Sequence, residues 1–230
     1  MSTCNAIGAF EKFGCFCGTL SAFIYFVVQF PQIYKNYKRK ATIGFSHYYV
    51  VIRLFGISFF VVNSIIKKVT WVFILAGFLL FFSYSILLIQ HAYYEFKHWD
   101  YLYFLMIIIP LVLSICFPST INITDFVSPI CQVVCYIPYI IECLQKETTS
   151  GISMLSLHFN FLGAIFGILM CTISIQCDSA GWLLHIISIC QSCAIYLIAI
   201  DYDEFELFDT YKKAPEGFRN HADFEAMGSA

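Results

Sequence analysis

Long apolar stretches with very few charged residues dominate the first 200 positions of this chain. Across all 230 residues, 60% are hydrophobic and only 12% are Asp, Glu, Lys or Arg, about half of the roughly 25% that is usual in soluble domains. A soluble protein could not cover its surface with so few charges. A disordered chain would not contain 25 Phe and 15 Tyr. We therefore predict an all-α integral membrane protein that lies among membrane lipids.

Seven segments are apolar and long enough to cross a bilayer as helices, which takes about 20 residues each. Lys and Arg gather in the loops after the first, third and fifth segments and in the C-terminal tail, which predicts a cytosolic C-terminus and a lumenal or external N-terminus. A glycosylation sequon at Asn122 lies on the predicted lumenal side and agrees with this orientation. The predicted spans are residues 13–34, 46–66, 71–94, 101–117, 126–141, 153–175 and 180–200.

An internal repeat organises these spans. Each copy ends one span, crosses a short loop and begins the next, and the two copies lie 107 positions apart. The identical pairs are Pro31/Pro138, Ile33/Ile140, Thr42/Thr149, Gly44/Gly151 and Ser46/Ser153.

One linker span between the copies gives the two repeats the same orientation. We therefore predict a 3+1+3 arrangement of parallel repeats about an axis along the membrane normal. The predicted units are residues 1–94 for the first repeat, 95–124 for the linker helix and lumenal loop, 125–200 for the second repeat, and 201–230 for a cytosolic tail.

The paired prolines are expected to act as hinges together with the residues that follow them, Gln32 and Tyr139. Proline cannot donate the helical hydrogen bond to the carbonyl four residues earlier, and a membrane helix tolerates the freed carbonyl where it lines a cavity. Matching positions for Pro31 and Pro138 would let each three-helix unit flex about a central site. The alternative is that proline is simply common in membrane helices.

The first copy resembles the motif of the PQ-loop family through Phe30-Pro31-Gln32, Asn36, Arg39-Lys40, Ile43-Gly44 and Ser46. The second copy is degenerate, with Tyr139 where the family has Gln. Members include cystinosin, lysosomal cationic amino-acid exporters and SWEET-type sugar transporters, and the similarity is greatest to the cystinosin branch. The resemblance implies a proton-coupled exporter of an amino-acid-type solute from the lysosome or vacuole. A SWEET-like sugar transporter, or a receptor or sensor like the KDEL-type receptors, stays open as an alternative.

The resemblance also implies a ligand cavity lined from both repeats, at Tyr25, Gln29, Arg53, Ser128 and Asn160. Compared with the cystinosin pattern, the cavity loses two acids and one lysine and gains Arg53 and His185. A charged side chain deep in the membrane is a candidate functional group, and a guanidinium suits a carboxylate or phosphate. Alternatively, Arg53 reaches interfacial water or pairs with backbone carbonyls.

A proton carrier is expected among the intramembrane histidines if transport is proton-coupled. His185 stands where the relatives have an acid and is the first candidate. His158 is the second, with a hydrogen-bonded core histidine as the alternative reading. Asn160 could bind solute but cannot titrate.

The tail contains Tyr202-x-x-Phe205, which has the form of a tyrosine-based sorting signal for adaptor proteins. Its acidic surroundings are also consistent with a solvated charge cluster. Most cysteines fall inside spans, where we expect them to act as small apolar residues. The sequence predicts no enzyme, metal site, cofactor or nucleic-acid partner.

Overall fold

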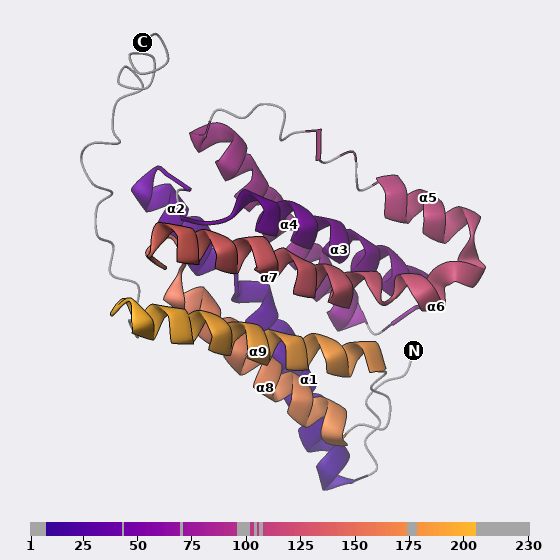
Figure 1. Ribbon diagram of the computed structural model, residues 1–230. Coiled ribbons are helices and arrows are strands. Elements are labelled where there is room, and N and C mark those ends of the chain that lie inside the picture. The colour runs from indigo at the N-terminus through magenta and orange to yellow at the C-terminus, as the bar shows by residue number, and fades with distance from the viewer. Residues whose placement is uncertain are drawn as a thin grey trace, which may run out of the picture.

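The computed structural model describes residues 8–42, 44–69, 71–95, 102–103, 105, 108–173 and 179–205, and these residues form a bundle of helices without strands (Figure 1). A short 3₁₀ turn, Pro118–Thr120, joins two of the α-helices. The α-helices are α1 (Ala9–Val27), α2 (Phe30–Arg39), α3 (His47–Ile66), α4 (Trp71–Tyr94), α5 (Ile108–Cys116), α6 (Ile121–Thr124), α7 (Val127–Lys146), α8 (Met154–Ile173) and α9 (Ser179–Asp201).

The all-helical membrane fold predicted from composition is confirmed. Within the described residues, 6 helical segments are long and apolar enough to cross a membrane. The first of them is α1 and α2 together, and the third is α4, whose bounds equal the predicted span 71–94. The predicted span 101–117 overlaps α5, and part of it lies outside the described residues.

The first span is interrupted just before Pro31. Helix α1 ends at Val27, Val28 and Gln29 form a turn, and α2 begins at Phe30. Pro31 thus lies in the first turn of a helix, where its missing N–H removes no helical hydrogen bond. Pro138, by contrast, lies inside the continuous helix α7. The two matched prolines therefore have different local settings, and only the first is next to a break in the helix.

The helices pack mainly across the two halves of the sequence. Helix α1 lies along α8, and α3 lies along α7, while α4 covers α3 and α9 covers α8 (Figure 1). Side chains from both halves, such as Leu54 and Leu87 from the first and Tyr139 and Ile195 from the second, form one buried cluster. The two halves therefore share a single core, because neither buries its apolar faces alone.

The loops that follow α2 and α7 share two backbone features. Lys40 (φ 54°) and Glu147 (φ 49°) both end their helix in the left-handed region, and a turn hydrogen bond follows at equivalent positions. The turn bonds run from Phe45 N to Thr42 O (3.0 Å) and from Ile152 N to Thr149 O (2.8 Å). The loops differ at the equivalent glycines, since Gly44 has a positive φ and Gly151 does not. We call residues 40–46 and 147–153 the first and second motif loops.

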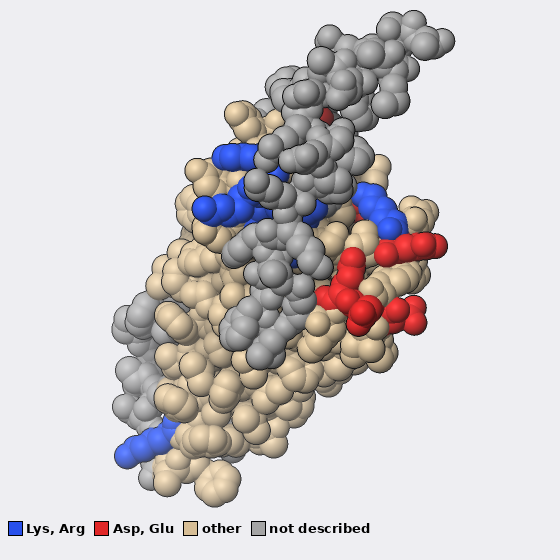
Figure 2. All heavy atoms as spheres, turned by 90° about the vertical axis from the view of Figure 1, so that its left-hand side faces the viewer, with Lys and Arg blue, Asp and Glu red and all other residues tan. Residues whose placement is uncertain are grey.

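Both motif loops lie at one end of the bundle, the motif-loop end. Lys, Arg, Asp and Glu side chains of the described residues gather there (Figure 2). They come largely from α2, from the end of α7 and from the end of α9. Examples are Lys38, Arg39, Lys40, Glu142, Lys146 and Asp201.

At the opposite end, Asn63 holds α3 to the segment between α5 and α7. Its Nδ2 donates to Thr124 Oγ1 and to Asp125 Oδ1, and its Oδ1 accepts from Ser114 Oγ, all at 3.0 Å. Lys67 forms an ion pair with Asp125 in the same cluster. Since Asn63 is 3% exposed, these bonds satisfy a buried amide that would otherwise be costly.

Two cysteines depart from the expected apolar role. Cys15, near the start of α1, and Cys171, near the end of α8, are disulfide-bonded. Both lie at the end opposite the motif loops. The other cysteines in the described part of the chain are free thiols.

The two motif loops meet backbone to backbone at a pair of glycines. A Cβ atom on Gly151 would lie 2.2 Å from the carbonyl oxygen of Gly44, and one on Gly44 would lie 3.1 Å from Gly151 Cα. Gly44 also has a φ of 83°, which side chains with a Cβ rarely adopt. Gly44 and Gly151 are thus the point where the two loops touch.

We expect Gly151→Ala to lower the free energy of unfolding by about 1–3 kcal/mol, because the added methyl group must push the loops apart. Thermal unfolding in detergent measures this. Gly8→Ala is the control, since nothing lies within 4 Å of a Cβ at Gly8, and it should cost less than about 1 kcal/mol. Equal stability of the two variants would contradict the close contact.

Candidate functional site

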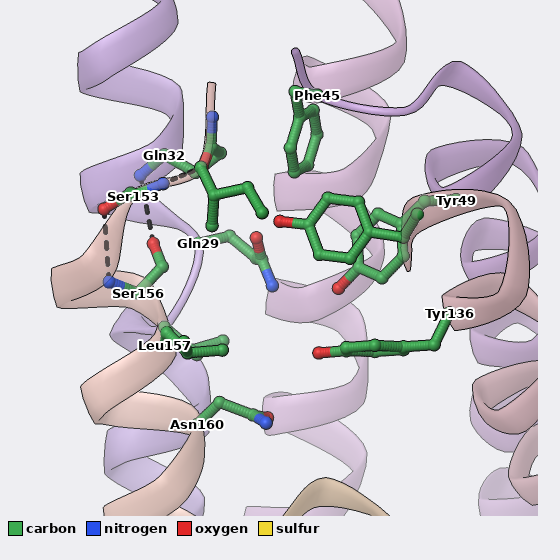
Figure 3. A pocket seen from close by; sticks show the side chains of 12 residues that line it. Gln29, Gln32, Phe45, Tyr49, Tyr136, Ser153, Ser156, Leu157 and Asn160 are labelled. Carbon is green, nitrogen blue, oxygen red and sulfur yellow. Dashed lines mark hydrogen bonds between the residues drawn. The ribbon is translucent and has the colours of Figure 1, made fainter. Parts of the chain in front are cut away.

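A cavity lies between the two halves, directly beneath the motif loops (Figure 3). The cavity is small, with about 30 Å³ of enclosed space. The lining comes from the break between α1 and α2, from both motif loops, and from α3, α7 and α8. Cross-half packing therefore creates the cavity, since each half supplies only part of its wall.

Most lining residues form equivalent pairs across the repeat. The offset of 107 positions that relates Pro31 to Pro138 also relates four pairs of lining residues, so the cavity straddles the repeat axis. These pairs are Gln29/Tyr136, Gln32/Tyr139, Phe45/Ile152 and Tyr49/Ser156.

The two sides of the cavity differ in chemistry. Amide and hydroxyl side chains lie on one side and aromatic rings on the other (Figure 3). Within the described lining there is no charged side chain. The polar wall consists of Gln29, Gln32, Ser153, Ser156 and Asn160, and the aromatic wall of Phe45, Tyr49, Tyr136 and Tyr139.

The aromatic wall is built from interlocked rings. Tyr49 stacks on Tyr139 with ring centroids 4.6 Å apart and meets Tyr136 edge-on at 5.3 Å, both favourable arrangements. Its hydroxyl lies 2.8 Å from the hydroxyl of Tyr84, which also accepts a hydrogen bond from Gln29 Nε2 at 2.9 Å. A hydrogen-bonded chain thus runs from the break after α1 through α4 to α3.

Gln32 joins the first half to the second motif loop. Its Nε2 donates to Asn36 Oδ1 (2.8 Å) and Gly151 O (3.0 Å), and its Oε1 accepts from Ser153 N (2.6 Å). Its backbone N donates to Ser156 Oγ at 3.1 Å. The side chain is 1% exposed, so it has little other means of satisfying its polar atoms. The residue predicted as part of a hinge therefore makes the contacts that hold the two halves together here.

Two cations of α2 strengthen the same junction. Lys35 Nζ donates to Ile152 O at 2.6 Å, and Arg39 Nη1 donates to Ser150 O at 2.9 Å. Charged donors form the stronger class of hydrogen bond. Together with Gln32, they close the motif-loop end over the cavity.

Arg53 lies one helical turn beyond Tyr49 on α3 and does not line the cavity. Its guanidinium is buried and forms a hydrogen bond with Tyr84, and Cys135 and Tyr49 lie near it. Its Nη1 is buried and has no hydrogen-bond partner among the described residues. Because a buried cation without a counter-ion costs several kcal/mol, this position suits an anionic group of a ligand.

Three other predicted site residues lie outside the cavity lining. Tyr25 and His185 contact each other, with 3.3 Å between Tyr25 Oη and His185 Nδ1 and ring centroids 5.9 Å apart. Gly167 leaves room for the histidine, since a Cβ there would lie 2.2 Å from its ring. Ser128 is buried against Gly56 of α3.

Of the predicted binding residues, Gln29 and Asn160 do line the cavity. Asn160 Nδ2 donates to Ser192 Oγ at 3.0 Å and to Ser188 O at 3.3 Å, which fixes the amide on the polar wall. Tyr139, predicted as a hinge residue, lines the aromatic wall.

The predicted tail signal starts within the packed structure. Phe205 is 46% exposed and lies edge-on to Tyr196 at 5.6 Å, while His158 Nδ1 lies 2.6 Å from Tyr196 Oη. Tyr202 is half-buried one turn earlier. His158 thus belongs to an aromatic cluster next to the tail rather than to the cavity lining.

Glu204 ties the tail to the second motif loop. Its carboxylate accepts hydrogen bonds from Thr148 Oγ1 (2.5 Å), Thr149 Oγ1 (2.9 Å) and the backbone N–H of Thr149. The predicted glycosylation site, Asn122, is exposed on α6 at the opposite end of the bundle.

Sequence reasoning missed the aromatic wall, although a signal was present. Tyr49 is equivalent to Ser156 in the repeat, and Tyr136 is equivalent to Gln29. The residue types differ within each pair, so a search for identical residues does not find them. Comparison of equivalent positions, rather than identical residues, would have found them.

Comparison with known families supports the motif. Residues 13–73 match the model of the PQ loop repeat family. This segment, from α1 to the first residues of α4, is therefore similar to a PQ loop repeat. No curated protein matches the chain significantly.

We expect Gln32→Leu to loosen the second motif loop, because it removes the side-chain bonds to Gly151 and Ser153. Loss of about 1.4 kcal/mol of local stability would speed hydrogen exchange of the Ser153 amide about tenfold, which mass spectrometry can follow. Gln191→Leu is the matched control: this buried amide donates to Gln132 O at 2.6 Å and not to a motif loop. Similar exchange at Ser153 in both variants would contradict the role of Gln32.

Proposed function

We propose that this chain is a secondary transporter that moves a small solute across a lysosomal or vacuolar membrane by alternating access. The observation that carries the proposal is the cavity between the halves, on the axis of the repeat, closed at the motif-loop end. Transporters built from internal repeats bind their solute at the repeat interface. The PQ loop repeat in residues 13–73 supports the same conclusion.

The moving parts are two three-helix units, residues 1–94 and 125–200, joined by residues 95–124. The seal between them at the motif-loop end combines hydrogen bonds and a glycine contact with the packing of Phe45 against Tyr139. The hydrogen bonds can exchange partners with water, which lowers the cost of opening this end. The break at Val28–Gln29 gives α2 a place to turn when Gln32 releases the second loop.

The solute is amino-acid-like and carries an anionic group. In this proposal Asn160 and Gln29 bind its polar groups in the cavity. Arg53, whose Nη1 has no hydrogen-bond partner among the described residues, binds the carboxylate after the neighbouring tyrosine side chains move away from it. Tyr25, Ser128 and His185 form the surroundings of that deeper position.

A sugar is the second candidate solute, and the cavity itself favours it. Amide and hydroxyl groups face aromatic rings across a lining without charged residues in the described structure. A sugar offers hydroxyls to one wall and an apolar ring face to the other. Arg53 would bind the anionic solute but would not be needed to bind the sugar.

The proposed orientation places the motif loops in the cytosol and the N-terminus in the lumen. The disulfide-bonded Cys15 and Cys171 lie at the proposed lumenal end, where oxidising conditions preserve such bonds. Asn122 lies at the same end and is available for glycosylation. Tyr202 and Phe205 are the proposed sorting signal on the cytosolic side, where an adaptor would have to displace Phe205 from its contacts.

Flux into proteoliposomes tests the proposal with a panel of amino acids, organic anions and sugars. We expect uptake of one class, reduced at least about tenfold by Asn160→Ala because the polar wall loses its amide. Asn122→Ala is the matched control, because Asn122 lies at the end of the bundle opposite the motif loops, and this variant should transport normally. Binding of a solute without flux would instead indicate a receptor on this fold and contradict the transporter.

Replacement of the buried cation separates the two solute classes. If the solute is anionic, Arg53→Met should reduce its uptake about tenfold or more, because the carboxylate loses its charged partner. Arg53→Lys should restore only part of this, since an ammonium lacks the planar fork. Normal uptake of an anion by Arg53→Met would rule out this role for Arg53, and normal uptake of a sugar by the same variant is what the second candidate predicts.

A further inference from the structure

The outer face of α2 changes in chemistry along the length of the helix. Phe30, Tyr34 and Tyr37 are exposed on this face, and Lys38 and Lys40 are exposed where the helix ends. Because a helix rises about 1.5 Å per residue, roughly 12 Å separates Phe30 from Lys38 along the axis. An apolar ring, two phenol rings and two ammonium groups thus follow one another toward the motif-loop end.

This order matches the layers of a bilayer. Phenylalanine suits the hydrocarbon, tyrosine gathers at the level of the lipid headgroups, and lysine at the end of a span extends into the headgroup layer. Each lysine also lies over a tyrosine ring. Lys38 Nζ is 5.4 Å from the ring centroid of Tyr34, and Lys40 Nζ is 3.9 Å from that of Tyr37. These cation–π contacts hold both charges at the level of the rings.

An apolar strip on α1 continues the same face away from the lysines. Phe26 meets Phe23 edge-on at 6.2 Å and Phe30 edge-on at 5.2 Å between ring centroids. Phe23 and Phe30 are exposed, and Phe26 is partly exposed. We call these three residues the phenylalanine strip. Its position fits the acyl chain of a lipid whose headgroup lies beside the lysines.

The second copy of the repeat has an equally exposed face with different side chains. The positions 107 residues later are exposed as well, but none of them is aromatic or basic. The equivalents of Phe30, Tyr34, Tyr37, Lys38 and Lys40 are Ile137, Ile141, Leu144, Gln145 and Glu147. The aromatic and basic face is therefore a property of the first copy and not a requirement of the repeated backbone.

Charge at the motif-loop end is divided between the halves in the same way. Figure 2 shows the acidic side chains gathered on one side of this end. Among the described residues there, the second half has Lys146 as its cation beside Glu142, Glu147, Asp201, Asp203 and Glu204. The first half has Glu95 as its acid beside Lys35, Lys38, Arg39 and Lys40. An anionic headgroup is therefore attracted to the first half and repelled by the second.

Two of the four cations are used inside the protein. Lys35 and Arg39 donate hydrogen bonds to Ile152 O and Ser150 O of the second motif loop. Lys38 and Lys40 face outward. The outward pair is thus the part of this basic cluster that is placed to bind a ligand from the membrane.

We propose that the outer face of α2 binds the headgroup of an anionic phospholipid in the leaflet at the motif-loop end. Lys38 and Lys40 pair with the phosphate and the second anionic group of the headgroup. One acyl chain lies along the phenylalanine strip. A zwitterionic headgroup binds less well, because its own ammonium group offsets the attraction to the lysines. This site is separate from the cavity and does not depend on whether the chain moves a solute.

Native mass spectrometry tests the site on the full chain, released from micelles that contain equal amounts of phosphatidylserine and phosphatidylcholine. Since each lysine near a membrane surface favours an anionic lipid about fivefold, the first lipid bound to the wild type should be phosphatidylserine at least about five times as often as phosphatidylcholine. Lys38→Gln/Lys40→Glu should bring this ratio within about twofold of one. The variant has the residue types of the second copy, in which Glu147 adopts a φ of 49° where Lys40 has 54°.

Lys12→Gln/Lys68→Glu is the matched control, because it makes the same two replacements at the opposite end of the bundle. Lys12 and Lys68 are exposed, and Lys68 has a φ of 54°, as Lys40 has. The net charge changes by the same amount, yet the ratio should stay at the wild-type value. Both variants should still bind phosphatidylcholine, which shows that their lipid-facing surface is folded.

A wild-type ratio near one would overturn the proposal, as would a ratio that Lys38→Gln/Lys40→Glu leaves unchanged. An equal fall in both double variants would also overturn it, because net charge rather than the face of α2 would then set the preference.

Discussion

The close approach of two backbone segments, at Gly44 and Gly151, sets how the halves of this protein meet. Because neither residue has a Cβ, the motif loops touch directly, and this brings the carbonyl of Gly151 within reach of Gln32. Lys35 reaches the same loop for the same reason. The roof of the cavity therefore combines backbone and polar groups with the buried side chains of Phe45 and Ile152. The polar part of this roof can open without exposing apolar surface, whereas Phe45 and Ile152 would have to leave the core.

Equivalent positions of the repeat carry different side chains, and this difference gives the cavity its character. Gln29 and Gln32 correspond to Tyr136 and Tyr139, so amides face rings across the axis. A fully symmetric cavity would offer the same groups twice and would suit a symmetric ligand. Divergence between the copies instead gives one polar and one aromatic wall, which fit a solute whose two faces differ. The repeat sets the positions of the lining residues, and the divergence between its copies sets their chemistry.

The spans could be predicted from sequence because a helix in a bilayer must satisfy its own backbone and present apolar side chains over a fixed length. Helix α4 begins and ends where its composition predicts. The cavity lining was harder to predict than the spans, because it depends on the angle at which α1 faces α8 and α3 faces α7. Arg53 illustrates this: it lies one turn from Tyr49, which lines the cavity, yet it is outside the lining itself.

The position of Arg53 has an energetic consequence for the proposed transport cycle. With the motif loops closed, its guanidinium is surrounded by phenol and thiol groups and makes no ion pair with a described residue. Neutral dipoles compensate a buried charge less well than a carboxylate does. An anionic solute that reaches Arg53 would therefore stabilise this closed state more than a state in which water reaches the arginine. By linkage, closure of the motif-loop end would raise the affinity for such a solute by the same factor.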